Sequence, residues 1–175
     1  MITTSKLTVT LLFMPLALAI IYMDIRYRRI PNKLVLATLV AGIGLNSIFR
    51  GWQGLASSLE GLGVAFGLMF ALHAIGTMGA GDVKLFAAVG SIVGIAHVLQ
   101  TLLIVTLIGG LLAAGKMVYL RRVGKTMSGV VQFFFGLLPG QTVPHFEVPR
   151  ESAHTLPYAI PICFGALLSV FMFGS

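Results

Sequence analysis

The stretch "LTVTLLFMPLALAIIYMDIRYRRIPN", residues 7–32, joins an uncharged apolar run to a short segment rich in arginine. A hydrocarbon layer about 30 Å thick is crossed by about 20 apolar residues in helical form. The apolar run, residues 7–23, is therefore predicted to be a transmembrane helix. Because the basic residues follow this run rather than precede it, the pattern does not fit a cleaved signal peptide.

The whole chain has the composition of an integral membrane protein. Of its 175 residues, 57% are hydrophobic and 10% are charged, and the mean hydropathy is +0.98. A water-soluble domain of this size needs more polar surface, whereas helices that face lipid can be apolar on all sides. Cys163 is the single cysteine, so one chain cannot form a disulfide or a cysteine-based zinc site.

Six apolar runs predict an all-α membrane protein, a bundle of about six transmembrane helices that forms one domain over residues 1–175. A further apolar segment, residues 127–138, is too short to cross the bilayer comfortably. It is expected to form an interfacial helix on the cytoplasmic side, within a loop of residues 121–155. The predicted spans are residues 7–23, 34–49, 55–75, 85–98, 99–120 and 156–173.

The basic residues predict how the bundle is oriented. When the spans are threaded alternately, most of the twelve Lys and Arg residues fall at one face, which the positive-inside rule makes cytoplasmic. Both chain termini are then expected outside. The net charge of +7 is accordingly interpreted as a topological signal. Membrane lipid is an expected partner and nucleic acid is not.

The two aspartates of the chain are the leading candidates for chemistry. Asp24 follows the first span and Asp82 precedes the fourth, so threading places both at the same depth on the cytoplasmic face. Two close carboxyls share a proton and can hydrolyse a peptide bond by acid and base catalysis. Asp82, at a helix start beside Lys84, is expected to be the base and Asp24 the acid. The alternative is a non-enzymatic carrier or assembly subunit that uses both carboxyls as a proton relay.

Two glycines precede Asp82 in "GAGDVKLFAAVG", residues 79–90. Gly79 and Gly81 are expected to allow unusual backbone dihedrals and the close approach of an extended peptide substrate. Lys84 is a candidate contact for an acidic residue of that substrate, or else marks the membrane boundary.

Three simpler or competing interpretations concern single side chains. Asp24 alone would be read as a helix-end salt bridge with the neighbouring arginines. Ser91 lies seven residues after Lys84 and could form a Ser-Lys dyad with it, although no nucleophile-elbow glycines surround Ser91. His73 is expected to make an interhelical hydrogen bond. The histidines show no metal-ligand spacing, so no metal site is predicted.

The two aspartate segments carry a family resemblance. "GAGDVKL", residues 79–85, and "MDIRYRRIPN", residues 23–32, resemble the aspartate motifs of the type IV prepilin peptidase family of intramembrane aspartyl proteases. "PYAIPI", residues 157–162, is similar to a Pro-Tyr-Ala stretch near the last helix of that family. The resemblance implies Asp24 and Asp82 as the catalytic pair, without a metal or cofactor in the peptidase step.

The resemblance also implies a substrate and a location. The substrates would be prepilins or pseudopilins, cleaved after their leader peptides at the cytoplasmic face of the bacterial inner membrane. Pro157 and Tyr158 would shape the site from the last helix. Because the sequence starts directly at the first span, it resembles the short form that serves Flp (tight adherence) pili, and no methyltransferase activity is expected. Association of copies into a homo-oligomer is left open.

Overall fold

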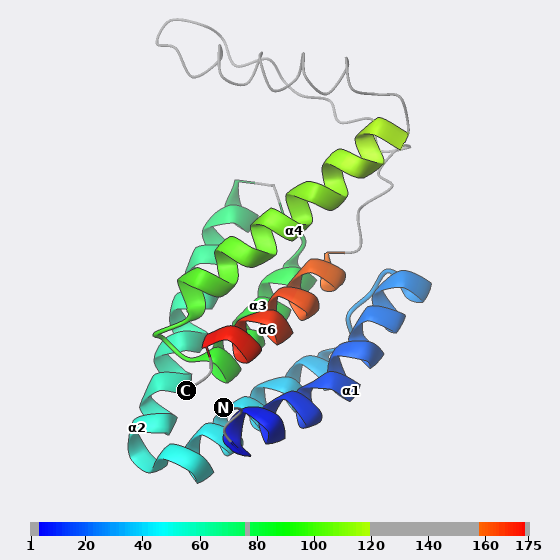
Figure 1. The fold of residues 1–175 in the computed structure, drawn as a ribbon. Coiled ribbons are helices and arrows are strands. Elements are labelled where there is room, and N and C mark those ends of the chain that lie inside the picture. The colour runs from blue at the N-terminus through cyan, green and yellow to red at the C-terminus, as the bar shows by residue number, and fades with distance from the viewer. Residues whose placement is uncertain (1–3, 76–77, 120–157, 174–175) are drawn as a thin grey trace, which may run out of the picture. The chain divides into compact units, whose positions relative to one another are not determined.

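The computed structural model describes residues 4–75, 78–119 and 158–173, and within these residues all regular structure is helical (Figure 1). The prediction of an all-α protein is therefore confirmed for the part of the chain that is described. The predicted interfacial helix and the loop around it lie outside those residues. The helices are α1 (Thr4–Tyr27), α2 (Asn32–Ala74), α3 (Ala80–Val93), α4 (Val98–Tyr119) and α6 (Ala159–Phe173).

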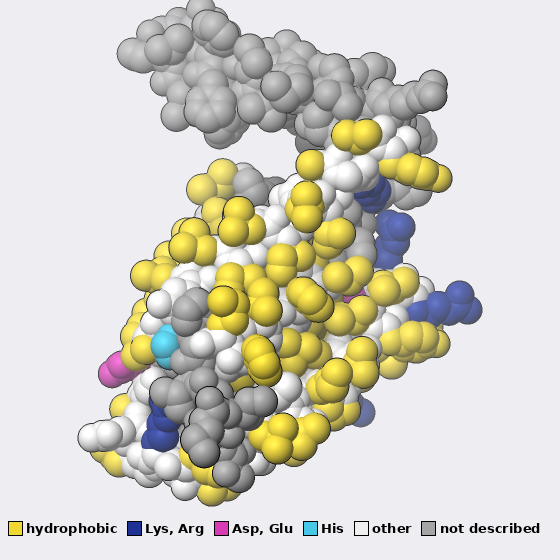
Figure 2. Space-filling view, viewed as in Figure 1, with side chains coloured by type: hydrophobic (Ala, Val, Ile, Leu, Met, Phe, Trp, Pro, Cys, Tyr) yellow, Lys and Arg dark blue, Asp and Glu magenta, His cyan; other side chains and the backbone are white. Residues whose placement is uncertain are grey.

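Three of the described helices are long and apolar enough to cross a membrane. They contain the stretches Leu7–Tyr27, Asn32–Ala74 and Val98–Lys116, and a shorter apolar stretch, Ala159–Met172, lies in α6. Hydrophobic side chains are widespread over the described part of the face seen in Figure 2. Membrane insertion thus agrees with the structure, while the count of six spans stays a prediction.

The chain divides into two compact units, residues 1–108 with 157–175, and residues 109–156. Helix α4 starts in the first unit and ends in the second. The candidate site lies entirely in the first unit, which also contains α1, α2, α3 and α6.

Helix α2 turns back on itself near its middle. Gly51 has φ 59° and ψ −138°, which is not a helical conformation and favours glycine. In a straight helix Asn46 and Ser58 would lie about 18 Å apart, yet Asn46 Nδ2 donates to Ser58 Oγ at 2.8 Å. Helix α2 therefore has two arms, residues 32–50 and residues 52–74, which hold the second and third predicted spans.

Helix α3 packs between the two arms of α2. On the first arm, Asn46 Nδ2 also donates to the carbonyls of Ser91 and Ile92, which lie at the end of α3. On the second arm, Gly61 and Ala65 lie against Gly90 of α3. A β-carbon on Gly90 would lie 2.5 Å from the Gly61 carbonyl oxygen and 2.6 Å from Ala65 Cβ. These contacts hold the C-terminal end of α3, the helix that carries Asp82 in its first turn.

Helix α3 begins and ends at glycines. Gly79 is the N-cap, and Gly94, with φ 72°, ends the helix. The helix thus begins five residues before the predicted fourth span, residues 85–98, and ends five residues before its end. Gly94 explains the earlier end, because a left-handed residue stops the helix in the middle of an apolar run.

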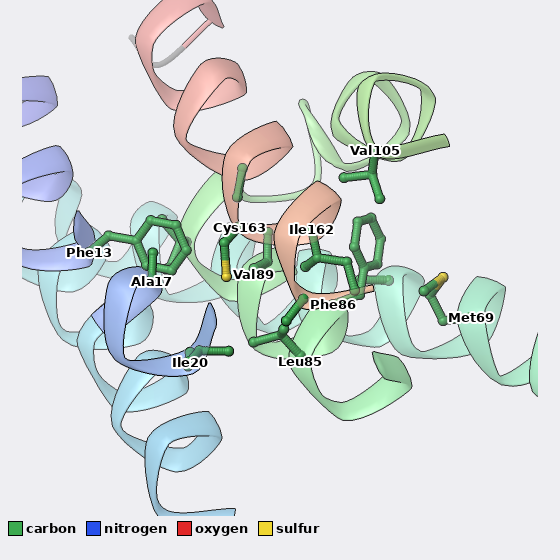
Figure 3. Packing of buried hydrophobic residues seen from close by; sticks show 14 of the residues in the cluster. Phe13, Ala17, Ile20, Met69, Leu85, Phe86, Val89, Val105, Ile162 and Cys163 are labelled. Carbon is green, nitrogen blue, oxygen red and sulfur yellow. The ribbon is translucent and has the colours of Figure 1, made fainter. Parts of the chain in front are cut away.

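Helices α1, α3 and α6 enclose a common apolar core. Figure 3 shows Phe13 and Ala17 of α1 facing Cys163 of α6, with Val89 of α3 beside it. Helices α1 and α6 run antiparallel, so the first residues of α1 and the last of α6 lie at the same end of the unit (Figure 1). The opposite end of this core carries the two aspartates.

Candidate active site

Asp24 lies in the last turn of α1 and is half-buried. The helix ends three residues later at Tyr27, because Arg28 adopts a left-handed φ of 50° while its N–H still donates to the Asp24 carbonyl at 2.9 Å. The side chain of Asp24 turns toward α6, where the Ala159 N–H donates to Oδ2 at 3.1 Å. This amide belongs to the first residue of α6 and has no partner within its own helix, so Asp24 caps α6 from a different element.

Asp82 lies in the first turn of α3 and is also half-buried. Its N–H donates to the Gly79 carbonyl at 3.1 Å, which closes the first turn of the helix. The carboxyl group lies back over Gly79, since a β-carbon built on Gly79 would be 3.1 Å from Asp82 Oδ2. Asp82 therefore occupies the N3 position, from which a carboxylate can reach back to the N-cap amide as in one half of a capping box; Gly79 has no side chain to supply the other half.

The charge of Asp24 acts on the carboxyl group of Asp82. Burial and the negative charge of Asp24 raise the pKa of Asp82 to about 6, while a hydrogen bond with the Gly79 backbone opposes the rise. That bond lowers the pKa, so it favours the charged form and must be donated by the Gly79 N–H. The structure thus brings together the two aspartates that the sequence singled out, from the end of α1 and the start of α3.

The comparison with protein families agrees with this geometry. Residues 11–114, more than half of the chain, match the Type IV leader peptidase family. The chain belongs to the type IV leader peptidase family. Both aspartates lie within the matched residues, and the resemblance inferred from their motifs is confirmed. No curated protein and no solved structure matches the chain.

In this family member, the pKa of Asp82 is shifted in the opposite direction from the one expected. The helix start and Lys84 were expected to favour its charged form, but the pKa is raised because burial is the largest influence. Lys84 is exposed on α3, where water screens its charge. A carboxyl that keeps its proton to a higher pH is better suited to donate a proton than to accept one.

The two glycines before Asp82 lie beside the site for a different reason from the one expected. Gly79 has φ −76° and ψ 146°, an extended conformation open to most residues, and Gly81 lies inside α3. The expectation of unusual dihedrals is therefore wrong. Gly79 leaves room for the Asp82 carboxyl, whereas a β-carbon on Gly81 would make ordinary contact with Ile30 at 3.8 Å.

The Ser-Lys alternative is not supported. Ser91 is buried, and its hydroxyl donates to the Ala88 carbonyl at 2.7 Å. Lys84 is exposed and lies two helical turns away, about 10 Å along α3. The two carboxyls therefore remain the candidate catalytic groups. Among the described residues, no group of three His, Cys, Asp or Glu side chains could hold a metal ion.

Tyr158 directly precedes α6, is half-buried and packs against the core; Pro157 lies outside the described residues. The sequence reasoning missed the Ala159 amide, which is the group of this segment that contacts Asp24. Pro157 and Pro161 could have indicated it, because prolines often mark the start of a helix, where amides are unpaired. It also missed the bond from His73 to the backbone before Gly79.

Proposed function

We propose that the chain is a membrane aspartic endopeptidase that removes the leader peptides of type IV or Flp-like prepilins. The observation that carries this proposal is that Asp24 and Asp82 come from separate helices and lie near enough for the charge of Asp24 to raise the pKa of Asp82. Family membership supports a leader peptidase, and the paired carboxyls supply the acid and base that peptide hydrolysis needs.

In the proposed reaction, water is activated between the two carboxyls. The Asp24 carboxylate takes a proton from the water while the water oxygen bonds to the scissile carbonyl carbon, and protonated Asp82 donates its proton to the carbonyl oxygen. When the tetrahedral intermediate collapses, Asp24 returns its proton to the leaving nitrogen, Asp82 recovers a proton from the hydroxyl, and the C–N bond breaks. These roles reverse the sequence-based assignment because burial keeps Asp82 protonated to higher pH.

The proposed location is the bacterial inner membrane, with the active site near the cytoplasmic face and both termini outside. The charge pattern supports this orientation, because Arg26, Arg28, Arg29 and Lys33 are exposed around the end of α1 that carries Asp24. The antiparallel pairing of α1 and α6 is consistent with both termini on one side. A prepilin would present its cleavage site at this face, next to its own apolar helix.

The proposal is tested by cleavage of a co-expressed prepilin. Asp24→Asn and Asp82→Asn keep the size of each side chain but remove its acid or base function, so each is expected to lower the cleavage rate by about 10²–10⁴-fold or more. The measurement is the mobility shift from precursor to mature pilin, with every variant confirmed in the membrane.

Glu60→Gln is the matched control, because Glu60 is an exposed carboxylate on α2. It is expected to cleave like the wild type. Normal cleavage by either aspartate variant would remove that aspartate from the mechanism. Absence of cleavage by the wild type, together with proton movement that depends on both aspartates, would favour the proton-relay alternative.

A further inference from the structure

His73, at the end of α2, makes a hydrogen bond to the segment that leads into α3. Its Nδ1 lies 2.7 Å from the carbonyl oxygen of Met78. A carbonyl oxygen can only accept, so His73 Nδ1 carries the proton and donates. The bond therefore fixes the tautomer of His73 and anchors the backbone one residue before the N-cap of α3.

The Met78 carbonyl and the Gly79 amide belong to the same peptide group. That group accepts a hydrogen bond from His73 at its oxygen, and at its nitrogen the Gly79 N–H donates to the carboxylate of Asp82. A peptide group is planar, so fixing its oxygen also fixes the direction of its N–H. His73 and Asp82 are thus connected through a single rigid unit.

We propose that His73 is a positioning residue that orients the carboxyl group of Asp82 through the Met78–Gly79 peptide group. This inference rests on the proposed function, in which Asp82 is a catalytic residue. A donor at the carbonyl oxygen also polarises the peptide and strengthens the bond from its N–H, since linked hydrogen bonds reinforce one another.

The surroundings show why this peptide group needs a partner. Met78 packs against the apolar core, and Gly79 is an extended residue without a side chain of its own. The backbone there has left α2, which ends at Ala74, and has not yet entered α3 at Ala80. A hydrogen bond from His73 supplies the restraint that helical bonding provides elsewhere.

The test uses two substitutions of His73 in the full chain. His73→Leu removes the donor, and the kcat for prepilin cleavage is expected to fall about 10- to 100-fold with KM unchanged, because small misplacements of a catalytic group cost this much. His73→Asn places an amide N–H where Nδ1 lies, so it is expected to restore most of the activity. His97 provides matched controls, since its Nδ1 bonds the Gln100 side chain at 2.8 Å. His97→Leu and His97→Asn are expected to retain wild-type kcat.

A second measurement does not depend on cleavage. Infrared titration of the Asp82 carboxyl, assigned by its loss in Asp82→Asn, reports the pKa of this group directly. In His73→Leu the pKa is expected to shift upward, because the Gly79 bond that lowers it is no longer held in place. Asp24, whose charge also acts on Asp82, is unchanged in this comparison, and exposed Lys84 on α3 is unchanged as well.

The outcomes separate this inference from the proposed function. If Asp82→Asn abolishes cleavage but His73→Leu matches the wild type in kcat and in the titration, the positioning role is wrong and the peptidase stands. A loss of activity that His73→Asn does not restore, with an unshifted titration, also overturns it in favour of a structural role. If the wild type cleaves no prepilin, the proposed function fails, and the titration alone decides whether His73 orients Asp82.

Discussion

The raised pKa of Asp82, which suits its proposed role as the acid, reduces the stability of the folded protein. The carboxyl is half-buried near the charge of Asp24, and the pKa is raised from an ordinary 3.8 to about 6. The folded state therefore binds a proton more tightly than the unfolded state between these two values. By linkage, the stability of the folded protein falls as the pH rises through this window, and the full cost is present above pH 6.

Asp82→Asn is accordingly expected to raise the thermal unfolding temperature at pH 7.5, because the amide removes a charge that burial disfavours. Below about pH 4 the acid is protonated in both states, so the gain is expected to disappear. Unfolding followed in detergent at both pH values measures the effect, with Glu60→Gln as the control. An equal gain at both pH values would mean that the charge of Asp82 is not the cause.

For single residues, the sequence was sufficient to identify the functional candidates, but it said less about the surroundings of each side chain. Two aspartates in a chain with few acidic residues could be recognised as functional candidates because charge is costly near a membrane. The charge state of Asp82 could not be predicted, since it depends on burial by other helices. The role of His73 was equally hidden, because its partner is a backbone carbonyl and not a side chain.

The packing of α3 against the second arm of α2 depends on glycines whose neighbours are backbone atoms. A β-carbon on Gly61 would lie 2.8 Å from the carbonyl carbon of Gly94 and 2.9 Å from its Cα. Backbone atoms cannot rotate away as a flexible side chain can, so α3 would have to shift. Gly63, on the same arm, has no atom within 4 Å of such a β-carbon.

Gly61→Ala is therefore expected to destabilise the protein by about 1–3 kcal/mol through overpacking. Gly63→Ala is the matched control, expected to be neutral or to stabilise by about 0.5–1 kcal/mol because alanine favours a helix. Unfolding of both variants in the same detergent gives the comparison. Similar stability of the two would show that α3 does not need the close approach at Gly61.

Some element boundaries could be read from the sequence and others could not. The end of the first apolar run before Asp24 was visible in the charge pattern. Asp82 was expected at a helix start, but hydropathy alone set the beginning of the span at Leu85, because it does not register Gly79 as the N-cap. The two arms of α2 were expected as separate spans, yet the structure joins them through Gly51 with little intervening loop.

In the whole molecule, the bend of α2 is expected to lie at a membrane surface. Trp52 follows Gly51 at this bend and is 80% exposed, and it is the single tryptophan of the chain. Tryptophan side chains prefer the interface between lipid and water. In lipid vesicles, quenchers in the headgroup region should therefore reduce Trp52 fluorescence more than quenchers deep in the acyl chains.

The opposite order of quenching would place the bend of α2 inside the hydrocarbon layer. Trp52→Phe is the control, because it removes the signal and leaves an aromatic side chain at the bend. At this scale, composition was sufficient to predict a helical membrane protein. The number of spans could not be settled by hydropathy, because α3 has only 14 residues and is largely covered by its neighbours.

The bond between Asp24 and Ala159 joins residues 135 positions apart. A ribosome makes Asp24 135 residues before Ala159, so the carboxyl is synthesised well before the amide that holds it. A partly made chain therefore has an incomplete centre, even when both aspartates have already been inserted. The proposed centre is therefore complete only after α6 has been made and has packed against α1.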